Sequence, residues 1–362
     1  MEEKSKIIST QSLCLIGKRR LSIAEKNIDC CLNANEALIE ILVCGICGSD
    51  IELVNENSLT SNNYNVLGHE IVGKVVALGD NCISSISIGE KVIIGPNINC
   101  GECEQCVKGN YNLCENLKTI GRRNIDGGFQ TFLKVPISQC YRKSDALEDT
   151  TAILTEPIAV CLHAIDIAEF QKGMNVAVIG CGTVGLLLIK LLKSFGAKMI
   201  YAYDIRQITL KFAKSFGADI IKNDLDDFEV AVMGSTENKG VDMVFEASGE
   251  FSNIGNSIKF VKAGSRIIVL SRPNAKCSLE LSCLDLFKKE VDIKFVRGYN
   301  KSFGKAVQII SENLEVSSII THKFGFDKII EYLQNNEKYS NEVIKAVFLP
   351  NDKMANISYE KG

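Results

Sequence analysis

The chain has 362 residues, a formal net charge of −3 at pH 7 and a pI near 5.8, so it lacks the basic balance that marks nucleic-acid-binding domains. Its 46% hydrophobic and 23% charged residues are typical of globular proteins, and its length suffices for two domains with their own cores. No signal peptide is recognisable, and the apolar stretch 174–189 is broken by glycines, so no membrane span is expected. The fifteen cysteines, many in apolar stretches, favour reduced thiols and a cytoplasmic location.

The first 155 residues are predicted to form a β-rich domain. Short runs of β-branched and other apolar residues alternate there with glycine, asparagine or proline. The predicted strands are 37–43, 70–78, 91–94 and 131–135.

Two short motifs in this domain contain typical metal ligands. Cys47 lies in the sequence GICGSD after the first predicted strand, and His69 lies in GHE before the second. Glu156 follows at the start of the next region. One Cys, one His and one carboxylate form a three-ligand zinc site that keeps an open position, as catalytic zinc sites do.

Four further cysteines are closely spaced. Cys100, Cys103, Cys106 and Cys114 fall within fifteen residues, with two residues between successive members of the first three. This spacing lets four thiolates converge on one ion, and a site filled by four protein ligands is structural rather than catalytic. The sequence therefore predicts a structural zinc site, with an iron–sulfur cluster as the main alternative.

Residues 156–295 are predicted to form a second domain of alternating strands and helices. A helix is expected to begin at Pro157, since proline suits the first helical position. The alternation that follows predicts a parallel sheet with helices on both faces. The predicted strands are 175–179, 199–203, 242–246 and 266–270, and the helices are 183–195, 208–216 and 252–260. After these, residues 296–362 are expected to return to strands and turns.

The sequence GCGTVG at residues 180–185 joins a predicted strand to a predicted helix. Glycines at these spacings allow a tight turn, close approach to a pyrophosphate and close helix–strand packing. Asp204 ends the next strand, where a carboxylate can bind the ribose hydroxyls and repel a 2′-phosphate, which favours NAD over NADP. The nearby Arg206 weakens that preference. The predicted cofactor-binding residues are Gly180, Gly182, Thr183, Val184, Gly185, Asp204 and Arg206.

In their order along the chain, these motifs resemble those of the zinc-dependent medium-chain alcohol and polyol dehydrogenases. The resemblance covers essentially the whole chain and is greatest to the sorbitol dehydrogenase branch, because Glu156-Pro157 stands where classical alcohol dehydrogenases carry a cysteine. It implies an α/β protein, with a GroES-like β-rich catalytic domain over 1–155, a Rossmann domain over 156–295, and a return to the catalytic domain over 296–362.

The resemblance also implies roles for individual residues. Cys47 and His69 would hold the catalytic zinc, with Glu70 and Glu156 as alternative third ligands. Because neighbouring residues of a regular strand face opposite ways, His69 and Glu70 can both bind only if the backbone turns there. Asp50 would accept a hydrogen bond from the His69 ring, and Ser49 would take the proton from the alcohol.

The implied reaction is transfer of a hydride from a secondary alcohol of a polyol or sugar alcohol to NAD, with two zinc ions per chain. A threonine 3-dehydrogenase or a 2,3-butanediol dehydrogenase would use the same mechanism and is the main alternative. A non-catalytic protein that binds zinc and nucleotide is a third hypothesis. Relatives of this kind are dimers or tetramers, so a homo-oligomer is expected, with a small-molecule alcohol as its substrate.

Overall fold

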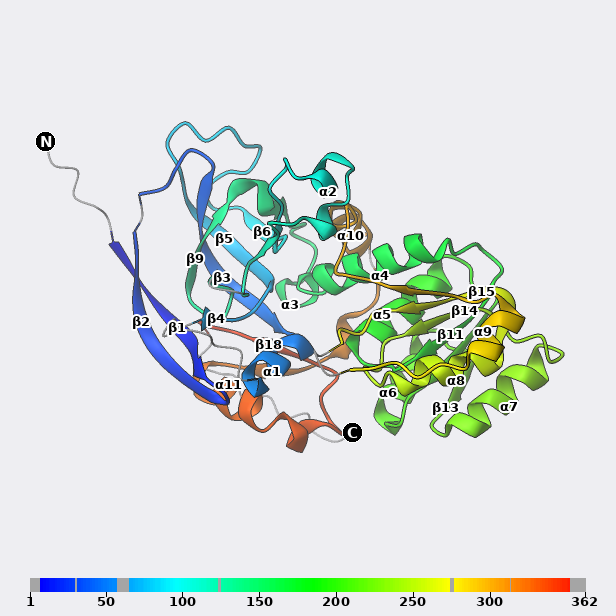
Figure 1. Cartoon of the computed structure of the whole chain (residues 1–362). Coiled ribbons are helices and arrows are strands. Elements are labelled where there is room, and N and C mark those ends of the chain that lie inside the picture. The colour runs from blue at the N-terminus through cyan, green and yellow to red at the C-terminus, as the bar shows by residue number, and fades with distance from the viewer. Residues whose placement is uncertain are drawn as a thin grey trace, which may run out of the picture. The chain divides into compact units, whose positions relative to one another are not determined.

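The computed structural model describes residues 7–29, 31–56, 65–122, 125–273, 277–312 and 314–351. It divides the chain into two compact units (Figure 1). The first unit comprises Met1–Glu156 and Phe303–Gly362, and the second comprises Pro157–Ser302. The first is therefore built from two separate stretches of sequence, whereas the second is continuous.

The first unit is dominated by a sheet with the strand order β10-β6-β5-β3-β18-β17, in which β9 also pairs with β3. Smaller sheets have the orders β2-β1-β4 and β7-β8. The strands are β1 (Ile7–Gly17), β2 (Arg20–Asp29), β3 (Glu36–Ile46), β4 (Asn65–Val66), β5 (Glu70–Leu78), β6 (Lys91–Ile94), β7 (Asn97–Ile98), β8 (Lys118–Thr119), β9 (Phe132–Pro136), β10 (Cys140–Arg142), β17 (Ile320–Phe324) and β18 (Lys345–Phe348). The helices are α1 (Gly48–Asn55), α2 (Glu104–Val107), α3 (Asp149–Ala152), α10 (Phe303–Ser311) and α11 (Phe326–Gln334), with 3₁₀ turns at η1 (Tyr111–Leu113), η2 (Ile137–Gln139), η3 (Ser317–Ile319) and η4 (Asn336–Tyr339).

Strand β3 occupies the middle of the main sheet. It pairs with β5 along one edge, and along the other edge it pairs with β9 near its start and with β18 at its end. Most of its residues are buried, as expected for a strand with neighbours on both edges. The antiparallel pairing of Phe348 with Cys44 and of Ala346 with Ile46 places the C-terminal strand next to the end of β3, where α1 begins.

The second unit contains a parallel sheet with the order β13-β12-β11-β14-β15-β16. The order reverses between β11 and β14, and ligands of such sheets bind where the order reverses, at the carboxyl ends of the strands. The strands are β11 (Asn175–Ile179), β12 (Met199–Tyr203), β13 (Ile220–Lys222), β14 (Val241–Glu246), β15 (Val261–Val269) and β16 (Asp292–Phe295). The helices are α5 (Thr183–Ser194), α6 (Gln207–Phe216), α7 (Leu225–Ser235), α8 (Ser252–Phe260) and α9 (Cys283–Lys289).

Helix α4 (Thr155–Ala168) begins two residues before the predicted start at Pro157. The first four amide groups of a helix have no partner within it, so proline is tolerated beyond the first position as well. The C-terminal return also differs from the expectation of strands and turns, because α10 and α11 lie within it. In α10 the buried residues are Phe303, Ala306 and Ile310, a spacing of three and four that is typical of a helix.

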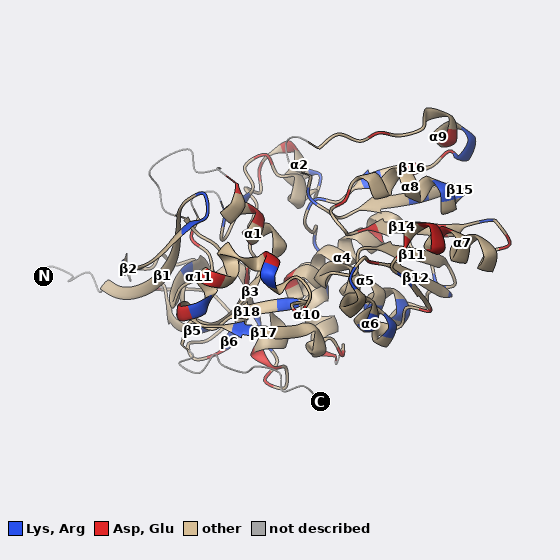
Figure 2. Cartoon of the chain, turned by 90° about the horizontal axis from the view of Figure 1, so that it is seen from below, with Lys and Arg blue, Asp and Glu red and all other residues tan. Residues whose placement is uncertain are grey.

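The stretch Asp149–Ala168 is long and apolar enough to cross a membrane by length and composition alone. Within it, 78% of the most apolar 18-residue window is buried inside the protein, as in the core helix of a globular domain. Acidic and basic residues are interspersed over the described ribbon (Figure 2). In that view α6 carries basic residues and α7 carries acidic ones, so the second unit presents both signs of charge.

Candidate active site and metal centres

Cys47 is the N-cap residue of α1 and follows directly after β3. Its backbone amide donates a hydrogen bond to Asp50 Oδ2 at 2.9 Å, which fixes the first turn of the helix. The Ser49 hydroxyl, also in this turn, donates to Cys47 Sγ at 3.2 Å. The sequence GICGSD thus forms a strand-to-helix turn that presents one thiol and one hydroxyl together.

His69 and Glu70 lie where the chain enters β5. Gly68 has a φ of 94°, a left-handed conformation that glycine adopts readily, and the backbone turns there before the strand begins. Ligand atoms of Cys47, His69 and Glu70 all lie within 4.8 Å of one another, and the latter two residues are buried. These three residues, called here the ligand triad, have the composition of an open zinc site.

Asp50 stands behind the His69 ring. Its Oδ1 lies 3.3 Å from His69 Nδ1, and both side chains are buried. Burial lowers the pKa of His69, but Asp50 and Cys47 together outweigh burial and raise this pKa well above its usual value. Since Nδ1 faces Asp50, the other ring nitrogen is left for a metal, an arrangement that is common behind metal-binding histidines.

Glu70 is paired with Lys345 of β18. The Lys345 ammonium donates to Glu70 Oε1 at 2.7 Å and to the Ile46 carbonyl at 3.1 Å, and it lies 2.5 Å from Glu70 Oε2. Both side chains are almost fully buried. Burial lowers the pKa of Lys345, but the negative charges around it, Glu70 foremost, raise it overall. An added Cβ at Gly45 would lie 1.9 Å from Glu70 Oε2, so the pair also requires glycine at that position.

Glu156, the other candidate ligand, lies in the first turn of α4 and outside the ligand triad. Its residue is partly exposed, yet burial of the carboxyl group raises its pKa to about 7. The positive charge of His69 opposes this rise, and the negative charge of Glu70 adds to it. Of the two carboxylates, the structure therefore brings Glu70 into the compact set and leaves Glu156 at its edge.

Arg122 is a residue of this site that sequence reasoning missed. Its guanidinium donates a hydrogen bond to the Ser49 hydroxyl. Its positive charge contributes, after His69 and the Cys47 amide, to the lowered pKa of Asp50, and it partly opposes the rise in the pKa of Glu156 that burial causes. No sequence motif singles out Arg122, because its partners are far away along the chain.

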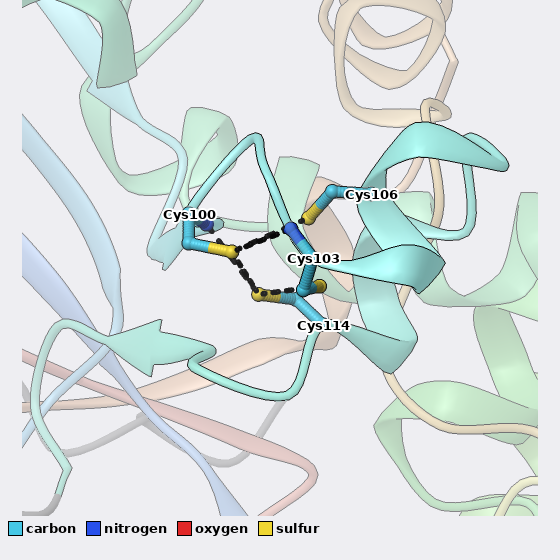
Figure 3. A group of neighbouring side chains, drawn as sticks. All are labelled: Cys100, Cys103, Cys106 and Cys114. Carbon is cyan, nitrogen blue, oxygen red and sulfur yellow. Dashed lines mark hydrogen bonds between the residues drawn. The ribbon is translucent and has the colours of Figure 1, made fainter.

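The four cysteines of the predicted structural zinc site come together around α2 and η1, with their sulfur atoms pointing toward one another (Figure 3). This group, called here the cage, consists of Cys100, Cys103, Cys106 and Cys114. The Sγ–Sγ distance is 3.9 Å for Cys100–Cys106, 3.9 Å for Cys103–Cys114 and 3.5 Å for Cys100–Cys114. A tetrahedral zinc ion with bonds of about 2.3 Å places its sulfur atoms about 3.8 Å apart. The arrangement therefore fits zinc without rearrangement.

Backbone amides already favour thiolates in this cage. The amide of Cys103 donates to Cys100 Sγ at 3.4 Å, and that of Cys100 donates to Cys114 Sγ at 3.4 Å. Hydrogen bonds from the backbone of Glu102 and Cys103 lower the pKa of Cys100 to about 6. Loss of water contact raises the pKa of Cys106 to about 12, so metal binding would displace a proton there.

The glycine motif of the second unit forms the turn from β11 into α5. Gly180 has a φ of 89°, and an added Cβ at Gly185 would lie 1.9 Å from the Gly180 carbonyl oxygen. Gly182 is the N-cap of α5 and has open space where a Cβ would be. Thr183 and Val184 follow in the first helical turn, whose amide groups suit a phosphate.

Asp204 is largely buried at the end of β12. Its Oδ2 accepts a hydrogen bond from the Cys181 amide at 2.7 Å, and its Oδ1 accepts one from the Arg206 amide at 2.8 Å. The Arg206 guanidinium lies 3.6 Å from the same oxygen. The structure thus brings Asp204 and Arg206 to the glycine turn, with the acidic group tied into the turn itself.

Glu246 at the end of β14 is a second residue that sequence reasoning missed. Its Oε1 accepts hydrogen bonds from the Ser248 and Gly249 amides at 2.7 and 3.2 Å, while its fully buried Oε2 has no hydrogen-bond partner in the described structure. An added Cβ at Gly180 would lie 2.5 Å from Ser248. Glu246 therefore holds the turn against which the glycine motif packs.

Comparison with known proteins places this geometry in a family. A family model described as the alcohol dehydrogenase GroES-like domain matches residues 33–145, and one described as zinc-binding dehydrogenase matches residues 183–312. An uncharacterized zinc-type alcohol dehydrogenase-like protein of Haemophilus influenzae is 30% identical, over 87% of this chain and 92% of its own length. The chain belongs to the zinc-dependent medium-chain alcohol dehydrogenase family.

Two further relatives have named activities. The sorbitol dehydrogenase of Bacillus subtilis is 27% identical, over 88% of this chain and 92% of its own length. The crystal structure of L-idonate 5-dehydrogenase from Escherichia coli K-12 superposes with a TM-score of 0.86 at 26% identity and covers 96% of this chain and 99% of that chain. The predicted family, fold class and alcohol dehydrogenase type of oxidoreduction are confirmed.

Proposed function

We propose that this dehydrogenase oxidises a secondary alcohol of a polyol or sugar alcohol to a ketone, with NAD as the hydride acceptor. The observation that carries the proposal is the ligand triad, in which three typical zinc ligands meet beside the Ser49 hydroxyl. The substrate class follows the relatives named for sorbitol and L-idonate, which are both polyhydroxylated. When bound at the triad, zinc would polarise the alcohol and lower its pKa.

The neighbouring residues would support this chemistry. Ser49 would accept the hydroxyl proton of the substrate, since its hydroxyl lies beside Cys47. Asp50 would hold the His69 ring in one orientation through Nδ1. Lys345 would neutralise Glu70, so that the buried site does not accumulate negative charge.

The proposed cofactor site is the glycine turn with Gly180, Gly182, Thr183, Val184 and Gly185. The amides at the start of α5 would bind the pyrophosphate. Asp204 would bind the ribose hydroxyls and favour NAD, although Arg206 beside it could also attract the phosphate of NADP. The cage cysteines would hold a second, structural zinc ion.

We also propose that the enzyme acts in the cytoplasm as a dimer or tetramer. None of the cysteines that the structure describes forms a disulfide, which suits a reducing compartment. The proposed domain limits are those expected from the sequence, and they lie close to the two compact units.

The test is NADH formation by the purified protein with polyols, L-threonine and 2,3-butanediol, each with NAD and NADP, before and after chelation. Chelator-sensitive oxidation of a polyol with NAD is the expected result. Oxidation of threonine or butanediol instead would keep the mechanism and change the substrate. A protein that binds NADH and zinc but oxidises none of them, with metal content unchanged in Cys47→Ser, would contradict the proposed function.

A further inference from the structure

Arg122 is a positively charged residue of the active site that forms no ion pair with any described residue. Its side chain makes a hydrogen bond to the Ser49 hydroxyl, and no described carboxylate lies within 4.0 Å of its guanidinium. The side chain is only partly exposed. A guanidinium has five N–H donors in a fixed fork, so donors remain for a further ligand.

The backbone that carries Arg122 is closely packed. Gly121 has a φ of 81°, and an added Cβ there would lie 2.4 Å from the Gly68 carbonyl oxygen. The Gly121 amide donates to the Ile125 carbonyl at 3.0 Å, and the Arg122 amide donates to the Thr119 carbonyl at 3.1 Å. Gly121 is therefore packed against Gly68, which directly precedes His69, and the Arg122 backbone is held by its hydrogen bond to Thr119.

Two of the three carboxylates of this site already have charged or polar partners, and the third, Glu156, forms no described ion pair within 4.0 Å and has a pKa raised to about 7 by burial. Asp50 faces His69 and the Cys47 amide, and Glu70 faces Lys345. Arg122 is the described cation of this site that lacks such a partner. It donates a hydrogen bond to the Ser49 hydroxyl, which is proposed to contact the reacting alcohol. A partly buried, unpaired charge at a substrate site is best matched by an oppositely charged ligand.

We propose that Arg122 binds an anionic group of the substrate, a carboxylate or a phosphate, so that the preferred substrate is an acidic or phosphorylated sugar alcohol rather than a neutral polyol. The inference rests on the proposed function and narrows its substrate class. The planar guanidinium can form paired hydrogen bonds with either oxyanion. Loss of a hydrogen bond to a charged group weakens binding about 10–100-fold.

The experiment compares a hexitol, a hexonate and a hexitol phosphate of matched stereochemistry with the full-length enzyme, Arg122→Ala, Arg122→Lys and the control Lys118→Ala, whose lysine is exposed on β8. The wild type should prefer the hexonate or the hexitol phosphate. Arg122→Ala should lower kcat/KM for that anionic compound about 10–100-fold more than for the hexitol, with the additional loss mainly in KM. Arg122→Lys should recover part of the loss, and Lys118→Ala should resemble the wild type.

Equal losses for all three compounds in Arg122→Ala would overturn the inference, since Arg122 would then act only through Ser49 or through the fold. A wild-type preference for the hexitol would also overturn it. Calorimetric binding of the same three compounds, with zinc content and Tm of each variant, separates the two proposals. If no compound is oxidised but an anionic one binds through Arg122, the proposed function fails and this inference stands.

Discussion

At the residue scale, Asp50 controls the position of His69 without belonging to the ligand triad. We expect Asp50→Asn to lower zinc affinity at the triad about 10–100-fold, because the ring loses the negative charge that orients it and increases its basicity. The cage should keep its zinc. Chelator competition followed by metal analysis measures both ions, with the exposed Asp80→Asn as the matched control. Unchanged zinc affinity in Asp50→Asn would show that the 3.3 Å contact has no role in metal binding.

Lys345 allows a second prediction at this scale. Replacing it with methionine leaves the Glu70 carboxylate buried without its cation, so the free energy of unfolding should fall by about 3–5 kcal/mol. The double variant Lys345→Met/Glu70→Gln should lose less than Lys345→Met alone, because no buried charge is left unpaired. Urea unfolding of proteins with equal zinc content measures this difference. Additive losses in the double variant would contradict a direct coupling between the two residues.

The sequence identified residues of this site unequally, and the reason is distance along the chain. Cys47 and His69 stand in short motifs and could be named, whereas Lys345 reaches Glu70 only because β18 pairs with β3. A signal existed, since Lys345 is the one charged residue in the buried strand KAVF, and such lysines are usually paired. Arg122 lacked even that signal, because nothing local predicts its hydrogen bond to Ser49.

At the scale of single elements, two glycines of the glycine turn should differ in what their substitution changes. Gly182→Ala should change the free energy of unfolding by less than about 0.5 kcal/mol, because its Cβ would enter open space, yet it should weaken NADH binding by occupying the position of a phosphate. Gly185→Ala should destabilise the fold itself, since its Cβ would collide with the Gly180 carbonyl oxygen. Thermal unfolding and NADH titration distinguish the two. Normal NADH affinity in Gly182→Ala would place the pyrophosphate elsewhere.

The cysteine cage permits a further prediction. Cys103→Ser should reduce the zinc content from about two ions to about one per chain and lower the Tm, because a four-ligand structural site contributes directly to folding. The exposed Cys283→Ser should leave both values unchanged. Zinc analysis by atomic absorption, together with thermal unfolding, provides the measurement. An iron signal in the wild type would favour the iron–sulfur alternative.

Elements were predicted best where their pattern is local. The strands β5, β6, β11 and β12 and the helix α8 match their predicted bounds, because each is a continuous apolar or periodic run with turn signals close to its ends. The C-terminal helices were missed although α10 has a helical spacing of apolar residues. Short strands lie on both sides of α10 along the chain, and the prediction of strands and turns for residues 296–362 therefore included it.

At the scale of the whole molecule, the two units differ in whether they are built from one or from two segments of the chain. The first unit is completed by β18 on β3, after an excursion of the chain through the second unit. The second unit is continuous, and α4 is tied to it by hydrogen bonds from Ser302 to the Ala159 carbonyl and from Arg266 to the Ala168 carbonyl. All six strands of its parallel sheet therefore come from one continuous segment of the chain.

This difference predicts that residues 155–302 form an autonomous domain. The fragment should unfold cooperatively, with a free energy of unfolding of about 5–15 kcal/mol, because it retains its parallel sheet and the core around β11 and β14. It should bind NADH but no zinc, since the ligand triad and the cage lie in the first unit. Residues 1–154, expressed alone as the matched fragment, should fail to fold because β3 lacks β18 along one edge. Circular dichroism, urea unfolding and NADH titration measure these outcomes. A fragment 155–302 without near-ultraviolet dichroism or cooperative unfolding would show that the second unit depends on the first for its packing.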